Sequence, residues 1–302
     1  MKKAIPFVLI TALCFATLEP VSHRLTTIDP SVITAIRFII GGIILLPFAF
    51  SAIKKQNIKI TQKSLLNLFL LSVLLIGLSM IPLQYAINGV GAGDASTVAI
   101  VAIIFCCNSV FTAIFSSIIL KDKISLRSWI GIALCLIGIF ISSIFKIVNG
   151  VGILSVALAL LAAITMGLYT VISRKFIKAI PGVVQNSFSF IMGGIVLAVV
   201  MFIVGEPLIP SGDTVVMDWG ILAYLGIVVT GIGYAAFFKA IEYGSATIAS
   251  SAFLIKPVLA PFAALLITFI FDNSIKGIEW YVWVAIPFVF AGSVLMLKPK
   301  AK

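Results

Sequence analysis

Charged residues are scarce in this sequence. Only 10% of its 302 residues are Asp, Glu, Lys or Arg, whereas 62% are hydrophobic and the mean hydropathy is +1.25. A soluble domain carries about 25% charged residues because its surface must face water, and a chain of this length cannot bury so much apolar area in one water-facing globule. The composition therefore excludes a disordered protein, a nucleic-acid-binding domain and a secreted disulfide scaffold. It predicts an integral membrane protein.

Catalytic and metal-binding signatures are also missing. The sequence has a single His, no Walker loop and no nucleophile elbow, and its four Cys residues lie in apolar runs without metal-ligand spacing. We therefore expect no enzyme activity, no metal and no cofactor. The cysteines are interpreted as buried, reduced thiols that pack as small apolar groups.

Long apolar runs dominate what is present. A helix that crosses the hydrocarbon of a bilayer needs roughly 20 mostly apolar residues, and ten such runs follow one another with short connections that carry turn residues such as Asp29-Pro30 and Pro181-Gly182. The fold class predicted is an all-α polytopic membrane protein with ten transmembrane helices. The expected spans are Ala4–Ser22, Ser31–Ser51, Leu65–Asn88, Ala95–Leu120, Leu126–Phe145, Val151–Ser173, Val183–Val204, Trp219–Glu242, Ser245–Phe271 and Ile278–Leu297.

The net charge of +11 is unevenly distributed between alternate loops. With the N-terminus inside, sixteen of the 21 Lys and Arg residues face the cytoplasm, three face outward and two lie within spans. This is the asymmetry that the positive-inside rule describes, so we expect a cell-membrane protein with both termini cytoplasmic. The start of the chain, Met1-Lys2-Lys3 before an apolar run, resembles a secretory signal but lacks a small-x-small cleavage site, and we expect it to be kept as the first span.

The two halves of the chain resemble each other. Phe38–Leu45 matches Phe190–Leu197 at six of eight positions with an offset of 152, and Ala86–Ser96 matches Ala240–Ser250 with an offset of 154. We place the two repeats at residues 1–147 and 148–302. Because each has five spans, an odd number, the copies must be inverted relative to each other. Inverted repeats are typical of secondary transporters, in which the substrate site lies near the midplane between the halves; a duplicated scaffold without transport is the alternative.

Three segments resemble the drug/metabolite transporter superfamily, specifically proteins with two EamA-type domains. They are Arg37-Phe38 in the second span, the stretch Lys121–Gly138 with its Trp-x-Gly and Leu-Ile-x-x-Gly elements, and the proline-bearing Lys256–Pro261. The resemblance covers the whole chain, together with the five-plus-five plan. It implies transport of small molecules, since members of this family move amino acids, nucleosides, sugar derivatives, polyamines and drugs, often outward.

Ionisable residues within spans are costly, so each calls for a partner or a purpose. Lys256 lies about 16 Å into the ninth span at 1.5 Å per residue, close to the midplane, beside Pro257. Glu19, beside Pro20, lies in the outer part of the first span. We interpret both as candidates for substrate binding or coupling, with Glu19 a candidate proton carrier unless it pairs with Lys256. A structural Lys bonded to carbonyls and an interfacial Glu without a role are the alternatives.

Other polar residues in spans are weaker candidates. Arg37 lies about two turns below the outer end of the second span, where snorkelling or a structural salt bridge is favoured over substrate contact. Uncharged polar side chains hydrogen-bond helices together at least as often as they bind ligands. The remaining candidates for substrate contact are Gln84, Tyr85, Asn108 and Tyr169.

The sequence therefore predicts a secondary transporter, an exporter by preference, of small organic metabolites such as amino acids, acting by alternating access. Without a Walker loop, its energy must come from a gradient, with protons as a candidate coupling ion. The expected partners are a small-molecule substrate and membrane lipid but no nucleic acid, in a monomer or homodimer. Efflux of drugs or cationic compounds, a channel, and an intramembrane enzyme or scaffold are the alternatives.

Overall fold

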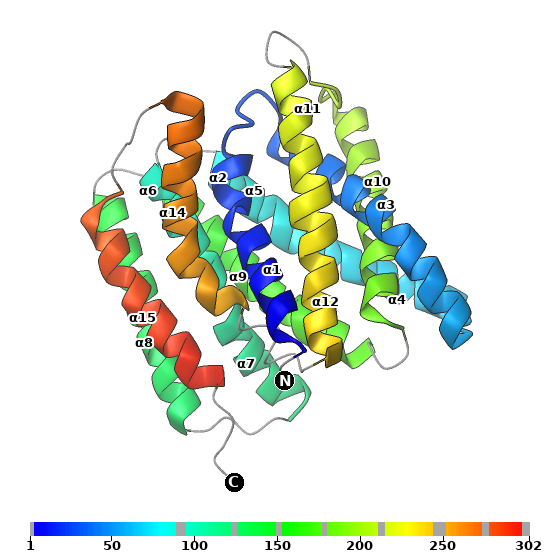
Figure 1. Cartoon of the computed structure of the whole chain (residues 1–302), viewed down its shortest axis with the longest axis horizontal. Coiled ribbons are helices and arrows are strands. Elements are labelled where there is room, and N and C mark those ends of the chain that lie inside the picture. The colour runs from blue at the N-terminus through cyan, green and yellow to red at the C-terminus, as the bar shows by residue number, and fades with distance from the viewer. Residues whose placement is uncertain are drawn as a thin grey trace.

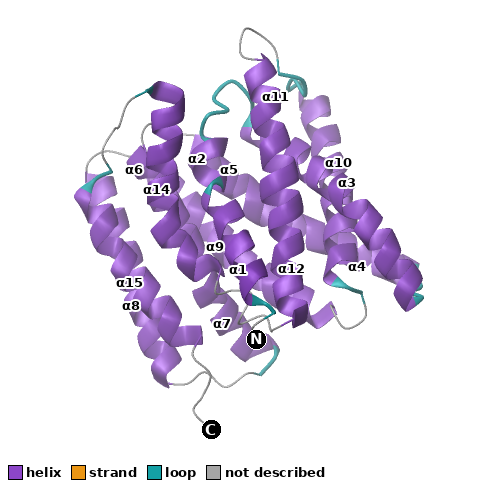
Figure 2. Ribbon diagram, viewed as in Figure 1, coloured by secondary structure: helices purple, strands orange, loops and turns teal. Residues whose placement is uncertain are grey.

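The structure is a computed structural model. It describes residues 3–88, 95–121, 126–148, 153–176, 180–210, 215–243, 252–273 and 278–297. Every regular element in these ranges is a helix (Figure 2), which confirms the predicted all-helical class. The connecting residues 89–94, 149–150 and 211–213 lie outside the described residues, as does Ser245 at the start of the expected ninth span.

Each of the ten apolar runs contains helix, and four of the runs contain it in two or three consecutive pieces (Figure 1). Seven of these units are long and apolar enough to cross a membrane, whereas α8, α14 and α15 have shorter apolar segments within the described residues, so ten crossings remain a prediction. The units are α1 (Ile5–Ala16) with α2 (Leu18–Ser22); α3 (Pro30–Gln56); α4 (Gln62–Ser72), the π-helix η1 (Val73–Met80) and α5 (Ile81–Asn88); α6 (Ala95–Cys106) with α7 (Asn108–Ile119); α8 (Leu126–Val148); α9 (Ile153–Phe176); α10 (Gly182–Val204); α11 (Val215–Tyr224), the π-helix η2 (Leu225–Ile232) and α12 (Gly233–Tyr243); α14 (Ala252–Asp272); and α15 (Trp280–Leu297).

The ends of α3 show how the sequence delimits these helices. Asp29 caps the N-terminus, its carboxylate accepting a hydrogen bond from the Ser31 amide at 2.7 Å, and Pro30 occupies the first turn, where its missing N–H costs nothing. At the other end Asn57 adopts the left-handed conformation with φ 49°, which satisfies the last carbonyls. The predicted turn at Asp29-Pro30 is therefore a helix cap.

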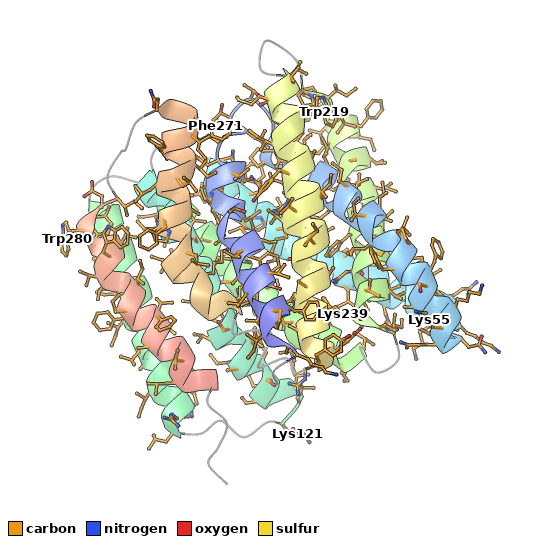
Figure 3. All side chains as sticks on the ribbon, viewed as in Figure 1. Lys55, Lys121, Trp219, Lys239, Phe271 and Trp280 are labelled. Carbon is orange, nitrogen blue, oxygen red and sulfur yellow. The ribbon has the colours of Figure 1, made fainter. Side chains whose placement is uncertain are left out.

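Successive units run in opposite directions across the molecule. In Figure 1, α1 begins and α15 ends at the lower edge. Figure 3 places the labelled lysines, Lys55, Lys121 and Lys239, along that same edge, with Trp219 and Phe271 at the opposite one. These three lysines thus lie at the edge that the sequence assigns to the cytoplasm; the orientation itself remains a prediction.

Counterpart helices of the two halves pack on each other. The two most extensive helix pairs are α3 with α10 and α8 with α15, and each joins one unit to its equivalent in the other half. Glycine permits the close approach of α3 and α10 from both sides. A Cβ atom at Gly42 would lie 2.6 Å from the Ile191 side chain, and one at Gly194 would lie 2.7 Å from the Ile39 side chain. The contact is therefore reciprocal, as the internal repeat predicts.

The two π-helices occupy equivalent places in the repeat. η1 and η2 each have eight residues, and their first residues, Val73 and Leu225, are 152 positions apart, the same offset that relates the second and seventh spans. π-helices are rare and occur frequently at functional sites. Both contribute residues to the central cavity described below, and sequence patterns did not reveal them.

The surface of the molecule is apolar and its centre contains charge. Large side chains such as Phe202, which is 70% exposed, and Phe262, which is 55% exposed, lie on the outside. Glu19, Arg37 and Lys256 are buried. This is the reverse of a soluble globule and fits a protein whose outer surface contacts lipid.

Candidate functional site

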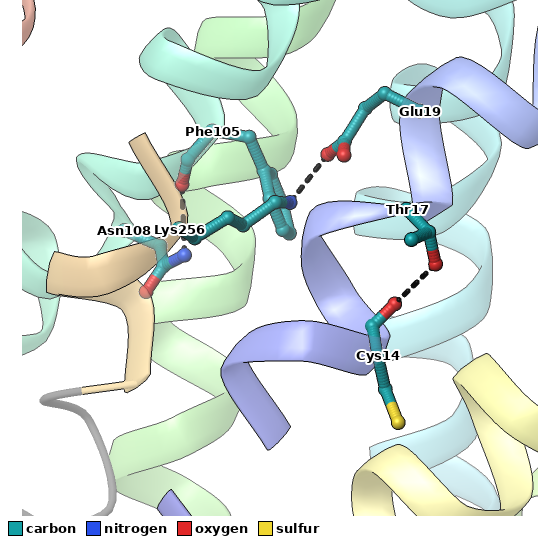
Figure 4. Close-up of polar contacts among 6 residues, drawn as sticks. All are labelled: Cys14, Thr17, Glu19, Phe105, Asn108 and Lys256. Carbon is teal, nitrogen blue, oxygen red and sulfur yellow. Dashed lines mark hydrogen bonds and ion pairs between the residues drawn. The ribbon is translucent and has the colours of Figure 1, made fainter. Parts of the chain in front are cut away.

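Two helical units break beside the centre of the molecule. The first unit breaks at Thr17, whose hydroxyl donates to the Cys14 carbonyl at 2.9 Å and lies 2.9 Å from the Tyr224 hydroxyl of α11 (Figure 4). The fourth unit breaks at Cys107, between α6 and α7. Discontinuous helices are a common way for transporters to form midplane sites, because the break frees backbone groups and redirects side chains.

An ion pair lies directly beside these breaks. Lys256 Nζ on α14 donates to Glu19 Oε1 on α2 at 2.5 Å, and both residues are 0% exposed (Figure 4). The pair joins the first half of the chain to the second. Such a pair must be held by good geometry, since removing two charges from a polar environment is costly.

An aromatic ring from the second break completes the surroundings of the lysine. The Lys256 ammonium lies 5.0 Å from the centroid of the Phe105 ring, in cation–π geometry. Phe105 is in the last turn of α6, and its carbonyl accepts a hydrogen bond from the Asn108 amide at 2.7 Å. Asn108 therefore holds the break at Cys107, and Figure 4 shows its amide directed to the Phe105 carbonyl.

Arg37 is a second buried cation in the same centre. It is 2% exposed, and its guanidinium lies 5.0 Å from the centroid of the Phe38 ring. Its Nε and Nη2 atoms have no hydrogen-bond acceptor among the described residues, and Glu19 Oε2 likewise has no donor. Among the described residues, the centre therefore holds two cations and one anion, and Lys256 is the cation that is paired with it.

This finding corrects the interpretation of Arg37 drawn from sequence. We expected it to snorkel to the interface or to form a structural salt bridge. It does neither within the described part of the chain, since it is buried and no carboxylate there lies within ion-pair distance. The reason is that α3 packs against α10 and η2 over its length, which turns this part of the helix inward.

A narrow cavity of about 10 Å³, room for roughly one water molecule, is lined by both cations. Its walls are close together, so an organic molecule could enter only after the helices move apart. Residues of both halves contribute, including Met80 from η1 and Thr230 from η2. The lining comprises Phe15, Leu18, Arg37, Phe38, Met80, Phe105, Met166, Val229, Thr230, Tyr234, Phe253 and Lys256.

Aromatic rings form most of one wall. Tyr234 lies at its centre, with ring centroids 5.1 Å from Phe15 and 5.0 Å from Phe190, both in edge-to-face contact. Phe253 stacks on Phe15 with centroids 5.6 Å apart. Sequence reasoning missed this wall, although Phe253 precedes Lys256 by three residues, a spacing that places side chains on one helical face.

Two further candidates lie away from this centre, at the outer end of α5. The Gln84 amide donates to the Ser22 hydroxyl at 2.5 Å and to Asn88 Oδ1 at 2.7 Å. The Tyr85 hydroxyl donates to Asp29 Oδ2 at 3.0 Å. Neither is among the residues that line the cavity, and these hydrogen bonds join the third unit to Ser22 at the end of α2 and to Asp29 at the start of α3.

Tyr169 is the last of the sequence candidates. It is buried, and its hydroxyl donates to Asn186 Oδ1 of α10 at 3.1 Å, which joins α9 to α10. Of the seven candidate residues, the structure thus brings Glu19, Arg37 and Lys256 together. The other four hold helices, as polar groups in membrane proteins commonly do.

Comparison with known proteins identifies the family. The model of the EamA-like transporter family matches residues 2–144 and again residues 153–298. The chain belongs to the EamA-like transporter family. The two EamA-like matches fall one on each half of the chain, in agreement with the internal repeat found in the sequence.

Relatives extend over most of the EamA-like chain. An uncharacterized transporter of Clostridium kluyveri is 37% identical over 305 residues, covering 98% of this chain and 93% of its own length. The transporter YoaV of Bacillus subtilis, also uncharacterized, is 27% identical and covers 78% of each chain. A solved crystal structure with 15% identity superposes with a TM-score of 0.65 over 98% of this chain and 96% of its own, which shows a shared fold.

Proposed function

We propose that this EamA-like transporter is a secondary transporter that moves a small organic metabolite by alternating access. The observation that carries the proposal is the buried ion pair between Glu19 and Lys256 at 2.5 Å. It connects the two halves at a cavity lined by both. Rocking of one half against the other would make or break this contact. The ion pair is therefore placed to couple the movement of the halves to the opening of the cavity toward one side or the other.

The charge of the centre favours some substrates over others. Glu19 Oε1 is engaged by Lys256, and Arg37 lines the same cavity as Lys256, so among the described residues a cationic drug would meet two cations and one carboxylate that is already paired. This argues against efflux of cationic compounds. It supports metabolites that carry an acidic group, amino acids among them.

The proposal includes a direction and an energy source. We propose ten spans with both termini in the cytoplasm of a cell membrane, and net export, as in many members of the family. Glu19 is the proposed proton carrier, because protonation of its carboxylate would release Lys256. The cavity lies within one chain, so we expect a monomer to be sufficient for transport.

Reconstitution in proteoliposomes tests this function. Vesicles preloaded with amino acids, organic acids, amines or nucleosides should show saturable counterflow of the matching labelled compound. We expect Glu19→Gln and Lys256→Ala to lower that flux about tenfold or more, because each leaves a buried charge unpaired. Lys239→Ala is the matched control, since Lys239 forms an exposed pair with Glu242 at 2.6 Å.

Four outcomes would contradict the proposal or a part of it. Absence of flux across the whole panel would exclude transport of these classes, and non-saturable flux or unitary currents would indicate a channel. Flux that is insensitive to both Glu19→Gln and Lys256→Ala would place the site elsewhere. A pH jump that leaves uptake unchanged would remove protons as the coupling ion.

A further inference from the structure

Arg37 is the one cation of the cavity whose donors are unsatisfied within the described residues. It is 2% exposed and lines the cavity, yet its Nε and Nη2 atoms have no acceptor. A buried charge without a hydrogen-bonded counter-ion is strongly disfavoured. The cation–π contact with the Phe38 ring covers a face of the guanidinium and leaves its donor edge available.

The two unsatisfied atoms define the chemistry of a partner. Nε and Nη2 lie on the same edge of the planar guanidinium, and their N–H groups point in parallel. This edge matches the two oxygens of a carboxylate, which it binds through two parallel hydrogen bonds. A neutral carbonyl or a cation could not satisfy both donors and the charge.

The balance of charges in the centre limits which anionic substrates fit. Arg37 and Lys256 supply two positive charges and Glu19 supplies one negative charge, which Lys256 already engages. A substrate with one negative charge restores neutrality. A zwitterionic amino acid adds no net charge, so the excess positive charge of the centre would remain even where its ammonium group bound Glu19 Oε2.

The other residues that line the cavity indicate the chemical character of the rest of the substrate. Phe15, Phe38, Tyr234 and Phe253 line it, and their rings contact one another through edge-to-face, stacked and tilted arrangements. Thr230 also lines it, but its hydroxyl donates to the Leu225 carbonyl at 2.9 Å. Such a wall favours an apolar or aromatic group and offers few hydrogen bonds to a sugar or a nucleobase.

We propose that Arg37 is the anion-binding residue of this transporter and that the substrate is a monocarboxylate with an apolar or aromatic body. The carboxylate lies on the Nε and Nη2 edge of Arg37, and the body lies against the aromatic wall. The Glu19–Lys256 pair stays intact while the substrate is bound. This inference rests on the proposed transport function for its meaning, but binding can be measured without transport.

Ligand-induced thermal stabilisation of the purified protein in detergent tests the proposal. The probes are 3-phenylpropionate, indole-3-acetate and hexanoate, each beside its neutral amide, with phenylalanine, inorganic phosphate and chloride as further arms. We expect at least one acid to bind about tenfold more tightly than its amide, because the amide cannot accept both hydrogen bonds as an anion. Phenylalanine, phosphate and chloride should bind more weakly than that acid.

Variants connect the preference to Arg37. Arg37→Lys keeps the charge but loses the paired donors, so the affinity for the acid should fall about tenfold while its amide is little affected. Arg37→Gln should abolish the discrimination between acid and amide. Arg127→Gln, at an exposed arginine of α8, is the control and should behave as the wild type.

The outcomes separate this inference from the proposed function. Four results would each overturn it. Two concern the acids: equal binding of acids and amides, or no binding of any acid. The other two are stronger binding of phenylalanine than of its deaminated analogue 3-phenylpropionate, and a response to phosphate or chloride alone. The comparison of acid with amide uses the wild type, so it decides even where Arg37→Gln does not fold. Acid binding without saturable flux would support the role of Arg37 and contradict transport. Saturable flux that is unaffected by Arg37→Lys would support transport and contradict the role of Arg37.

Discussion

Lys256 Nζ lies 2.5 Å from Glu19 Oε1, although the two residues are 237 positions apart in the sequence. They are brought together because α14 packs against both α1 and α2, and because the break at Thr17 lets α2 leave the path of α1. The pair is therefore a tertiary contact between the two halves. Its stability should depend on both partners being present.

Removing one partner of this pair should be far more damaging than removing both. Glu19→Gln or Lys256→Met alone should lower the free energy of unfolding by about 3–5 kcal/mol, because each leaves an uncompensated buried charge. The double variant should recover much of that loss. Thermal unfolding of the four proteins in detergent, analysed as a double-mutant cycle, measures the coupling.

The exposed pair of Lys239 and Glu242 provides the control cycle. Its side chains are 49% and 38% exposed, so its coupling should not exceed about 1 kcal/mol. Additive effects at Glu19 and Lys256 would show that the two side chains do not interact in the folded protein.

The contact between α8 and α15 requires a hydrogen atom at position 292. A Cβ atom there would lie 2.5 Å from the Gly131 carbonyl oxygen and 2.8 Å from the Cys135 amide nitrogen, so backbone would have to move. We expect Gly292→Ala to destabilise the protein by about 1–3 kcal/mol, as measured by thermal unfolding.

Gly220→Ala in α11 is the matched comparison. A Cβ atom at position 220 would meet nothing within 4 Å, and alanine favours helix over glycine by about 1 kcal/mol. This variant should therefore be neutral or slightly more stable. A Gly292→Ala variant that is as stable as Gly220→Ala would mean that α8 and α15 do not approach each other as described.

The hydroxyl pair of Thr17 and Tyr224 should stabilise the first break. Thr17→Val and Tyr224→Phe each remove one side of the 2.9 Å hydrogen bond and should each cost about 1 kcal/mol. Because the bond is shared, the double variant should cost less than the sum of the two. Strictly additive effects in thermal unfolding would argue against this contact.

Cysteine labelling can test the orientation of the chain. Cys14, Cys106, Cys107 and Cys135 are all buried, so the wild type should react little with a membrane-impermeant maleimide. Lys121→Cys should be labelled in inside-out vesicles but not in intact cells. Trp219→Cys, at the opposite edge of the molecule (Figure 3), should show the reverse, and labelling of both from one side would overturn the predicted topology.

The length of the apolar runs and the local composition were enough to predict the helices but not their interruptions. The cap at Asp29-Pro30 was predictable because it depends on residues that are adjacent in sequence. The breaks at Thr17 and Cys107 were not, because neither threonine nor cysteine is a helix breaker and the cause lies in contacts such as that with Tyr224.

The site was predictable in part for the same reason. Glu19 and Lys256 stand out because a charge within an apolar run is expensive wherever it lies. Their pairing, and the exclusion of Gln84 from the cavity, depend on which helices are neighbours. From the sequence, Arg37 was a weaker candidate for substrate contact than its place in the structure indicates. Depth along a helix does not show whether a side chain faces lipid or the interior of the protein.

The breaks in the helices distinguish the two copies of the repeat. The first half is interrupted at Thr17 and Cys107, whereas the counterparts α9 and α14 are continuous across their described ranges. If the two inverted copies were equivalent, the outward-open and inward-open states would be mirror versions of each other. Substrate would then bind from both compartments with equal half-saturation concentrations. We expect the interrupted helices to bend more readily than their continuous counterparts, so loading from the two compartments should differ in half-saturation and maximal velocity. The driving gradient would still set the final distribution of substrate between the two compartments. Only the rates of transport would differ between the two directions.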